Sequence, residues 1–471
     1  MQTKEITVTG YLPDERPPFW KLVLFALQQI VVMFPATVLV ALLTGFHVST
    51  TIFASGLATL CFILVTGRKI PLYYGSSFSY IAAICSITGV EQIGQIADKP
   101  LIAAAQLGIV LSGLVSIAAG LIIRRFGQEA IEKVLPATVT GSIAMVIGLS
   151  LAGNAMSNFT SLPVNVTEAT SSMATNLAFV ICVVTLLATV CFSVFLKKGV
   201  WGQLPILFGL LTGYLLSLIL TWTTGVKFVD FDKLGATSIF ALPQFSFPWQ
   251  ADPASIGKAI LAIMPIAIAT IPESTAHIYQ LDIYVNDLAK QKGKDEYKIA
   301  GMLGQNLIGD GLGDIISGFI GGPAGTNYGE NISTMAITKN YSVWVLIGAS
   351  IITMVISLFT PLTAAVYSIP NAVIGGLSIY LFGVIAAQGI TIMVNKKVDL
   401  FDAKNLAVIA TIMIIGLGGT YAFDGGMIPV FGLKLPAIAS AAIFGILLNL
   451  LLSIKGKKRK NGAETSEEPK E

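Results

Sequence analysis

Apolar runs that are long enough to enter or cross a lipid bilayer recur along almost the whole chain. A bilayer core requires about 20 predominantly apolar residues per helix. Only 12% of the 471 residues are charged, about half the share found in soluble domains. This pattern excludes a soluble enzyme, a nucleic-acid-binding protein and a disordered scaffold. It predicts an all-α integral membrane protein with 14 transmembrane segments, at residues 20–45, 49–67, 73–90, 101–123, 135–155, 173–196, 202–222, 257–284, 299–321, 328–339, 343–367, 371–394, 405–424 and 435–454.

The positively charged residues predict how these segments are oriented. Loops on the cytoplasmic side of a membrane carry more Lys and Arg than loops on the other side. When the N-terminus is placed inside and the segments alternate, all but five of the 29 Lys and Arg residues fall on the inner side. We therefore expect a multi-pass protein of the plasma membrane with both termini in the cytoplasm. The net charge of +3 gives no indication of a nucleic-acid partner.

Two short segments interrupt the regular series of apolar helices. Residues 74–79 read Tyr-Gly-Ser-Ser-Phe-Ser, and residues 328–333 read Tyr-Gly-Glu-Asn-Ile-Ser. They open the third segment of the first seven and the third segment of the second seven. Because seven is odd, the two halves enter the membrane from opposite sides. The match predicts a seven-plus-seven inverted repeat with short strand or half-helix breaks in segments 3 and 10, and such breaks indicate a transporter's binding site. The alternative is a chance match between two kinked helices.

Broken segments at membrane depth offer free backbone donors. Non-helical backbone is tolerated there only where protein or a water-filled cavity satisfies its N–H and C=O groups. Two half-helices whose N-termini meet present unpaired N–H groups and partial positive charge. Donors of this kind suit the carbonyl oxygens of a small polar solute.

Ionisable side chains inside the predicted segments are candidate functional residues, because charge at bilayer depth is costly. Segment eight carries Glu273 and His277 four residues apart on one helix face, and segment ten opens with Glu330. Because segments eight, nine and ten are consecutive, we expect their polar faces to converge. Segment nine contributes a polar face made of Asn306, Asp310, Asp314 and Ser317.

Each of these residues also has a structural interpretation. We expect Asp314 to brace the break in the next segment, whereas Asp310 fits bracing and proton handling equally well. Glu273 and Glu330 fit substrate binding better than a purely structural role. His277, one turn from Glu273, fits proton coupling, with a satisfied core histidine as the alternative.

The combination of acceptors and donors predicts the class of ligand. Carboxylates accept hydrogen bonds from N–H groups, and backbone N–H groups donate to carbonyls. A planar molecule with alternating N–H and C=O groups, such as a pyrimidine or purine base, matches both. An anion would be repelled by the two glutamates, and a sodium ion or an amine would leave the helix N-termini unused. We expect no metal site and no cofactor, because zinc needs three or four ligands and the only other histidine, His47, lies in a loop.

The residues around segment ten resemble the signature of a known family. Residues 321–331 read Gly-Gly-Pro-Ala-Gly-Thr-Asn-Tyr-Gly-Glu-Asn, and residues 335–339 read Met-Ala-Ile-Thr-Lys. Further support comes from Gly-Asp-Gly at 309–311 and Leu-Phe-Gly at 381–383. On these motifs the chain resembles the nucleobase–ascorbate transporter family over about residues 17–454, and within it the group of bacterial uracil permeases.

The resemblance implies a transporter, not an enzyme, that is built from two domains. Residues 1–130 and 255–369 would form a substrate-carrying core from segments 1–4 and 8–11. Residues 131–254 and 370–454 would form a gate from segments 5–7 and 12–14, with a homodimer contact on the gate, and residues 455–471 would form a cytoplasmic tail. The implied activity is import of a nucleobase by proton symport through alternating access of core and gate.

The family's functional residues carry over onto matching positions. The residues implied to contact the base are Phe78 and Gly329 through their backbones, Tyr328 as a pocket wall, and Glu273 and Glu330. The residues implied to carry the coupling proton are His277 and Asp310. The residues implied to support the site from behind are Gln28, Gln29, Ser76 and Asn331.

Two departures and several alternatives accompany this resemblance. Gln29 stands where family members often have histidine, and Ser333 stands where the signature has glycine. Glu330, in place of the glutamine of purine-type members, favours uracil over xanthine. A xanthine or purine transporter and a sodium-coupled transporter remain alternatives. An anion transporter of the same seven-plus-seven architecture is a further alternative, although it would be expected to present Arg or Lys near the tenth half-helix, and Lys339 follows that half-helix.

Overall fold

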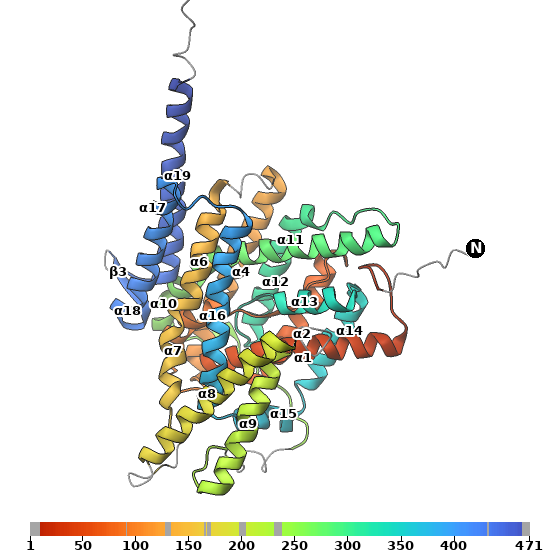
Figure 1. The fold of residues 1–471 in the computed structure, drawn as a ribbon, viewed down its shortest axis with the longest axis vertical. Helices are drawn as coiled ribbons and strands as arrows, with labels where there is room; N and C mark the ends of the chain where they lie inside the picture. Colours follow the sequence, from red (N-terminus) through yellow and green to blue (C-terminus); the bar gives the residue numbers. More distant parts are fainter. Residues whose placement is uncertain are drawn as a thin grey trace, which may run out of the picture.

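The chain folds almost entirely into helices of very different length (Figure 1). The computed structural model describes residues 10–90, 92–127, 133–163, 166, 171–196, 204–229, 238–430 and 433–463. Within these ranges nine helices are long and apolar enough to cross a membrane, and three shorter helices are also apolar. The helical membrane architecture is therefore confirmed in outline, while the seven-plus-seven arrangement of 14 crossings stays a prediction.

One group of helices packs around α4 and α12. Helix α12 lies against α4 and α2, α14 lies against α2 and α1, and α10 lies against α4. Helix α11 continues from α10 through the 3-10 turn η7. The bounds are α1 (Phe19–Thr44), α2 (Val48–Val65), α4 (Lys99–Phe126), α10 (Pro253–Ile263), η7 (Met264–Ile266), α11 (Ala267–Gln291), η8 (Ile299–Met302), α12 (Leu303–Ile320), α14 (Val343–Ile356) and α15 (Thr360–Tyr367).

A second group packs around α16. This helix lies against α6 and α8, α9 packs on α8, and α17 packs on α6 and α19. In Figure 1, α6, α17 and α19 stand together on the left, whereas α1, α2, α11 and α14 lie on the right. The bounds are α6 (Ala137–Ser150), α7 (Ala152–Ser157), η2 (Asn158–Thr160), α8 (Ser171–Phe195), α9 (Pro205–Thr224), η6 (Pro248–Gln250), α16 (Asn371–Asn395), α17 (Ala403–Met413), the π-helical turn η9 (Ile414–Gly418), α18 (Gly419–Ala422), η10 (Asp424–Gly426) and α19 (Ala437–Ala463).

Within the described residues, each predicted segment coincides with a helix or a short series of helices, apart from the strand that opens segment 73–90. Three segments differ further in detail. Segment 257–284 belongs to a helical stretch that runs over Pro253–Gln291 and tightens at η7, where Pro265 has no N–H to donate. Segment 343–367 divides into α14 and α15. Segment 435–454 starts inside an unpredicted hairpin of β3 (Met427–Val430) and β4 (Leu433–Pro436), so its helix begins only at Ala437.

Glycines bring α4 and α12 into close contact along their length. A Cβ atom on Gly311 would lie 2.3 Å from the carbonyl oxygen of Gly113, and one on Gly304 would lie 2.8 Å from that of Gly120. Small residues at such positions let two helix backbones approach closely, which is how helices associate strongly inside a membrane. The α4–α12 pair therefore forms a tightly packed support behind the residues that follow α12.

The two interrupted segments meet through a pair of three-residue strands. Strand β1 (Tyr74–Ser76) pairs antiparallel with β2 (Gly325–Asn327), and Gly75 lies opposite Thr326. Two further bonds extend the ladder, because the N–H of Ser77 donates to the carbonyl of Ala324 and that of Tyr328 donates to the carbonyl of Tyr73. The predicted strand and half-helix breaks in segments 3 and 10 are both present, and they satisfy each other's backbone groups.

Side chains from neighbouring helices satisfy the outer edges of this small sheet. On the β1 edge, the hydroxyls of Ser55 and Thr59 on α2 donate to the carbonyl of Tyr74 over 2.7 and 3.0 Å. On the β2 edge, Asp314 on α12 accepts the N–H of Gly325 over 2.8 Å, and it also accepts the hydroxyl of Tyr74 over 2.5 Å. Asp314 therefore braces the break, as the sequence predicted.

Two tyrosines lock the strands together by packing over glycines of the opposite segment. The ring of Tyr74 covers Gly325, where an added Cβ would lie 2.4 Å from the ring. The ring of Tyr328 covers Gly75 at the same 2.4 Å. Real Cβ atoms do not approach other atoms this closely, so both positions require glycine. The repeated Tyr-Gly pattern in the sequence thus corresponds to a structural lock.

We predict that Gly75→Ala destabilises the protein by about 1–3 kcal/mol, because an extra methyl group in a packed interior forces its neighbours to shift. The buried Tyr328 ring would have to move away from β1. Thermal unfolding in detergent micelles measures the effect as a lowered midpoint temperature.

The matched control is Gly257→Ala in α10, where an added Cβ meets nothing within 4 Å. Alanine favours a helix over glycine by about 1 kcal/mol, so this variant should unfold at an equal or higher temperature. Equal midpoints for the two variants would contradict the tyrosine–glycine lock.

Candidate functional site

The candidate site lies where two half-helices begin beside the β1–β2 pair. After β1 the chain enters the 3-10 turn η1 (Phe78–Tyr80) and then α3 (Ile81–Thr88), and after β2 it enters α13 (Gly329–Thr338). The first N–H groups of a helix have no partner inside the helix. Because the two strands are antiparallel, these two helix starts face the same region from opposite directions.

The ionisable residues predicted on segments eight and ten meet at this place. His277 on α11 lies against the start of α13, since a Cβ atom on Gly329 would be 2.9 Å from His277 Nε2. The Glu330 carboxylate is close enough to Glu273 to act on it electrostatically. Glu273, His277, Gly329 and Glu330 are all half-buried, although Ser274 and Tyr328 beside them are buried. The arrangement brings two acidic groups, one imidazole and a helix N-terminus to a single partly accessible place.

Phe78 forms the opposite side of this region and contacts the second helix group. It is half-buried, and its ring meets that of Phe382 on α16 edge to face, with the centroids 6.1 Å apart. In the sequence, Phe382 is part of the family-like Leu-Phe-Gly motif, and no role is predicted for it. The structure places it where the two groups of helices meet beside the candidate site.

Tyr328 is turned toward the strands more than toward open space. Its hydroxyl donates to the carbonyl of Ser76 over 2.9 Å and lies 3.0 Å from the hydroxyl of Thr37 on α1. The residue is only 4% exposed. Tyr328 and Ser76 therefore hold the site's framework, and contact of Tyr328 with a ligand stays a prediction.

Asp310 lies in a buried polar network behind the site. Its Oδ2 atom accepts the hydroxyl of Ser274 on α11, and also the side-chain amides of Asn306 over 3.5 Å and Asn327 over 3.2 Å. Its Oδ1 atom has no hydrogen-bond partner within the described residues. The network joins α11, α12 and β2, and it borders a cavity of about 10 Å³ that is also lined by Thr326, which is room for at most one water molecule.

The two predicted proton-coupling residues do not touch each other. Among the described residues, His277 and Asp310 share no hydrogen bond, and His277 Nδ1 has no hydrogen-bond partner. Asn327 relates them indirectly, because it binds Asp310 and lies two residues before Gly329. Ser274 and Asn327 are not among the residues predicted from the sequence. Ser274 is indicated there only by its position beside Glu273, and Asn327 only by its place within the signature at residues 321–331.

The two predicted supporting amides on α1, Gln28 and Gln29, differ in their hydrogen bonding. Gln29 is buried, and both its side-chain oxygen and its carbonyl accept the amide of Asn331, over 2.7 and 3.0 Å. This pair fastens the first turn of α13 to α1. Gln28 Nε2 is buried and has no hydrogen-bond partner within the described residues. In the part of the chain that the structure describes, no group of three or more His, Cys, Asp or Glu side chains is arranged to hold a metal ion.

Comparison with known proteins places the chain among transporters. Residues 20–425 match the Permease family. The chain is 37% identical to the uracil permease of Bacillus caldolyticus over 93% of its own length and 94% of that protein. It is 34% identical to the uracil permease of Bacillus subtilis over 97% of both chains. It is 35% identical to the putative pyrimidine permease RutG of Escherichia coli over 94% and 92%.

Solved structures share the fold at much lower identity. The transmembrane domain of the cyanobacterial bicarbonate transporter BicA superposes with a TM-score of 0.58 at 14% identity, over 94% of this chain and all of that one. The murine anion transporter Slc26a9 in its inward-facing state superposes with a TM-score of 0.61 at 12% identity, over 97% and 74%. These likenesses concern the fold alone. The family match and the identities show that this multi-pass membrane protein belongs to the permease family of transporters.

Proposed function

We propose that the protein imports a nucleobase, with uracil as the substrate, by proton symport. The observation that carries the proposal is the pairing of two acidic side chains with two half-helix N-termini at one partly accessible place. Glu273 and Glu330 accept hydrogen bonds, and the backbone at Phe78 and Gly329 donates them. A pyrimidine base presents N–H and C=O groups alternately along one edge and matches both. The relatives named uracil permease support the same substrate.

The charge at the site favours a neutral base over an anion. An anion transporter of this architecture would present a cation at the start of the tenth half-helix, where this chain has Glu330. Lys339 lies beyond the opposite end of α13, and its ammonium donates to Gln291 Oε1 over 2.9 Å. Position 339 lies nine residues after position 330, which corresponds to a helical rise of about 13 Å. Lys339 therefore does not neutralise a ligand held at Glu330.

His277 and Asp310 are proposed to carry the coupling proton. Histidine is the residue type at the site whose ordinary pKa lies nearest neutral pH. His277 lies on α11, the helix of Glu273, and its ring lies against the start of α13. Within the described residues, one oxygen of Asp310 accepts three hydrogen bonds and the other has no hydrogen-bond partner. A charge at such depth is costly, and a proton on the free oxygen would remove it. His277 lies on α11, and Asp310 accepts hydrogen bonds from Ser274 of α11 and Asn327 of β2. A change of protonation at either residue would therefore act on the elements beside the proposed substrate.

The two groups of helices support a core that moves against a gate. The proposed core, residues 1–130 and 255–369, contains the α4–α12 pair, the strands and both half-helices. The proposed gate, residues 131–254 and 370–454, contains the group around α16 and would also form the homodimer contact. Phe78 and Phe382 meet across the boundary, where alternating access requires a contact that forms and breaks. The seven-plus-seven inverted repeat belongs to the same proposal.

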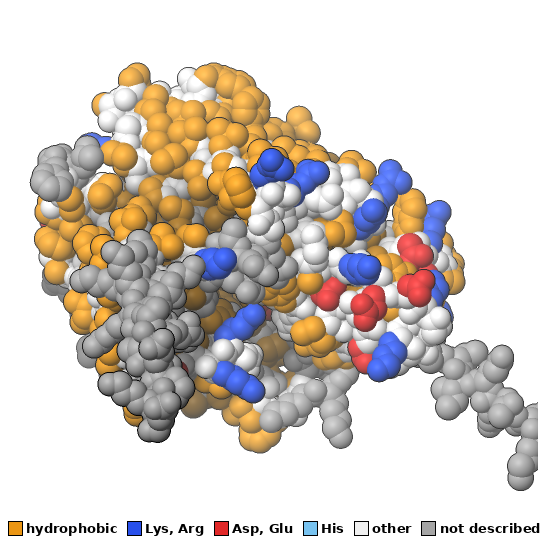
Figure 2. Space-filling model, turned by 90° about the horizontal axis from the view of Figure 1, so that it is seen from above, with side chains coloured by type: hydrophobic (Ala, Val, Ile, Leu, Met, Phe, Trp, Pro, Cys, Tyr) orange, Lys and Arg blue, Asp and Glu red, His pale blue; other side chains and the backbone are white. Residues whose placement is uncertain are grey.

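The orientation with both termini in the cytoplasm is also part of the proposal. Figure 2 shows Lys and Arg side chains gathered on one face, with acidic side chains close beside them on its right-hand part. Loops rich in Lys and Arg face the cytoplasm. Uptake of radiolabelled uracil by a transport-deficient bacterial host tests the substrate and the import activity. Unlabelled uracil should compete strongly, while xanthine, sulfate and bicarbonate should not, and uptake of labelled sulfate or bicarbonate without uptake of uracil would favour an anion transporter.

We predict that Glu330→Gln weakens uracil binding more than about tenfold, because the variant exchanges a charge-assisted acceptor for a neutral amide. The amide also donates hydrogen bonds, so acceptance of other bases is expected to rise. Binding of labelled uracil to the purified protein measures the loss, and competition with xanthine measures the change in selectivity.

Glu296→Gln is the matched control for this change. Glu296 is exposed in the loop after α11, and the substitution is chemically identical. It should leave uracil binding unchanged. An unchanged affinity in Glu330→Gln, with normal folding, would remove Glu330 from the substrate contacts.

We predict that His277→Ala uncouples transport from the proton gradient while leaving part of the binding intact. The variant removes the imidazole but keeps Glu273 and Glu330. In proteoliposomes it should exchange labelled uracil for unlabelled uracil at fixed pH, yet fail to concentrate uracil under an imposed pH gradient. The same assay with and without Na⁺ distinguishes a sodium-coupled mechanism.

Thr275→Ala is the control, because the Thr275 hydroxyl donates only to Ile271 of its own helix among the described contacts, so the variant should accumulate uracil normally. A His277→Ala protein that accumulates uracil as well as the parent, together with an Asp310→Asn protein that does not, would assign the proton to Asp310 alone.

A further inference from the structure

The chain before α1 forms an isolated parallel β-bridge, Tyr11 with Asn340, at the end of α13. The N–H of Tyr11 donates to the carbonyl of Lys339 over 2.8 Å, and the N–H of Tyr341 donates back to the carbonyl of Tyr11 over 2.7 Å. Val343 N–H then donates to the carbonyl of Pro13 over 3.1 Å. Lys339 has φ 50° and ends α13. The N-terminal segment therefore satisfies a carbonyl that the end of the half-helix leaves without a helical partner.

Both the backbone and the side chains of this segment pack closely against the rest of the protein. Gly10 has φ 148°, and a Cβ atom there would lie 2.7 Å from the carbonyl oxygen of Lys339. Leu12 is fully buried, in the same hydrophobic cluster as Ile278 and Leu288 of α11 and Ile332 of α13. The segment thus contacts both helices that carry the site's carboxylates.

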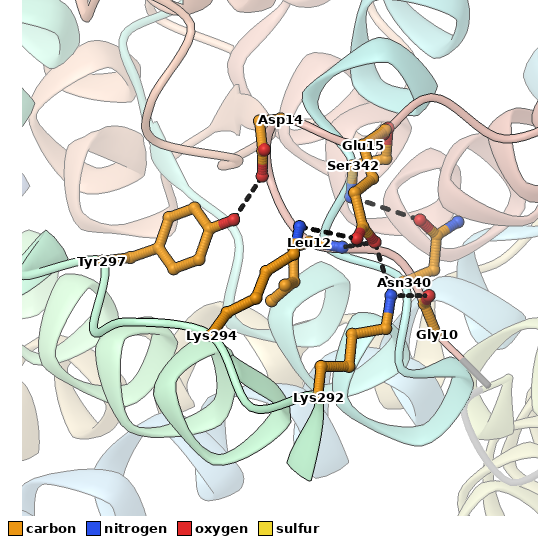
Figure 3. Close-up of polar contacts among 9 residues, drawn as sticks. All are labelled: Gly10, Leu12, Asp14, Glu15, Lys292, Lys294, Tyr297, Asn340 and Ser342. Carbon is orange, nitrogen blue, oxygen red and sulfur yellow. Dashed lines mark hydrogen bonds and ion pairs between the residues drawn. The ribbon is translucent and has the colours of Figure 1, made fainter. Parts of the chain in front are cut away.

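Glu15 joins this segment to the loop that follows α11 (Figure 3). Its Oε2 atom accepts the Lys292 ammonium over 2.6 Å and the Leu12 N–H over 2.9 Å, and its Oε1 atom accepts the Lys294 ammonium over 3.0 Å. Lys292 also donates to the carbonyl of Gly10 over 2.8 Å. The Lys292–Glu15 and Lys294–Glu15 contacts are both ion pairs.

Further contacts surround this ion-paired group. The Ser342 hydroxyl, just before α14, donates to the carbonyl of Glu15 over 2.5 Å. The Tyr297 hydroxyl, from the loop before α12, donates to Asp14 (Figure 3). A single stretch of chain therefore touches the ends of α11, α13 and α14 and the approach to α12.

We propose that residues 10–15, here named the N-terminal clamp, position α13 relative to α11 and so set the spacing of Glu273 and Glu330, with Glu15 as its central positioning residue. The inference rests on the proposed function, because the two glutamates matter as substrate ligands. Helix α11 runs about 21 Å from His277 to Gln291 at about 1.5 Å per residue. The site lies near one end of α11 and α13, and the clamp fastens the other end of both. Because helices are stiff, a shift at the clamped ends is transmitted to the carboxylates.

The clamp is expected to stay closed across the physiological pH range. Partial burial of Glu15 opposes its ionisation, but hydrogen bonds from Lys292, the Leu12 N–H and Lys294 outweigh burial and lower the pKa of Glu15 to about 2. A carboxylate whose pKa is lowered on folding contributes stability above its unfolded pKa of about 4.3 and loses it as the pH falls toward the folded value. The effect of removing Glu15 should therefore be the same at pH 8 and pH 5.5.

The test is a double-mutant cycle on uracil affinity. Glu15→Gln and Lys292→Gln should each raise the Kd for labelled uracil about fivefold, and the effect in the double variant should be less than additive, because the two side chains form one ion pair within a shared network of contacts. Gly10→Ala should raise the Kd as well while leaving every charge in place. Glu296→Gln, in the loop after α11, should leave the Kd at the parental value. Melting temperatures are recorded for all variants in the same detergent.

Two further outcomes decide the inference. A lowered melting temperature with a parental Kd in both Glu15→Gln and Gly10→Ala would overturn it, since the segment would then stabilise the fold without positioning the site. If the parent itself binds no uracil, the substrate proposal fails separately. In that case, amide hydrogen exchange tests whether the N-terminal clamp positions α13. Glu15→Gln should speed exchange at residues 339–343 and also at residues 330–334. An effect confined to residues 339–343 would show that the clamp does not position the start of α13.

Discussion

Unpaired backbone in the buried interior is the constraint on which the rest of this structure depends. Two of the apolar segments begin with extended rather than helical backbone, and each N–H or C=O group left unpaired in an apolar interior would cost several kcal/mol. The protein meets this by pairing the two breaks with each other as β1 and β2. The pairing needs only three residues from each segment. It places residues 74–76 beside residues 325–327, and it thereby brings two helix N-termini together.

Most of the neighbouring polar residues serve this pairing before they serve any ligand. Ser55, Thr59 and Asp314 satisfy the outer edges of the strands, and Ser317 holds the carbonyl of Pro323 just before β2. The polar face of α12 therefore divides into a bracing half, Asp314 and Ser317, and a half that reaches α11 through Asp310. The remaining ionisable residues of the candidate site, Glu273, His277 and Glu330, lie half-buried.

The sequence predicts much of this framework because the signals are local. Apolar length predicts the helices, and the repeated Tyr-Gly pattern with its short segments predicts where the helices break. Spacing on α11 and α12 predicts which polar side chains share a face, and the bracing role of Asp314 follows from its position before the break. The contacts of Ser274, Asn327 and Phe382 could not be predicted in this way, because each joins elements far apart in the chain. The same holds for the β3–β4 hairpin and for residues 10–15, whose sequence Gly-Tyr-Leu-Pro-Asp-Glu has no helix or strand pattern.

The site is held by long-range contacts at both ends of α13, and this has a consequence for how selectivity arises. At its start, β2 and the Gln29–Asn331 pair fix the backbone of Glu330. At its end, the N-terminal clamp holds Lys339 and Tyr341. Helix α13 spans only ten residues, too few to be stable alone in water, so its position comes from these attachments. A base that requires a different spacing between Glu273 and Glu330 would have to displace α13 against both attachments. Under the proposed function, selectivity for one base therefore depends on residues that never touch it, as well as on the carboxylates themselves.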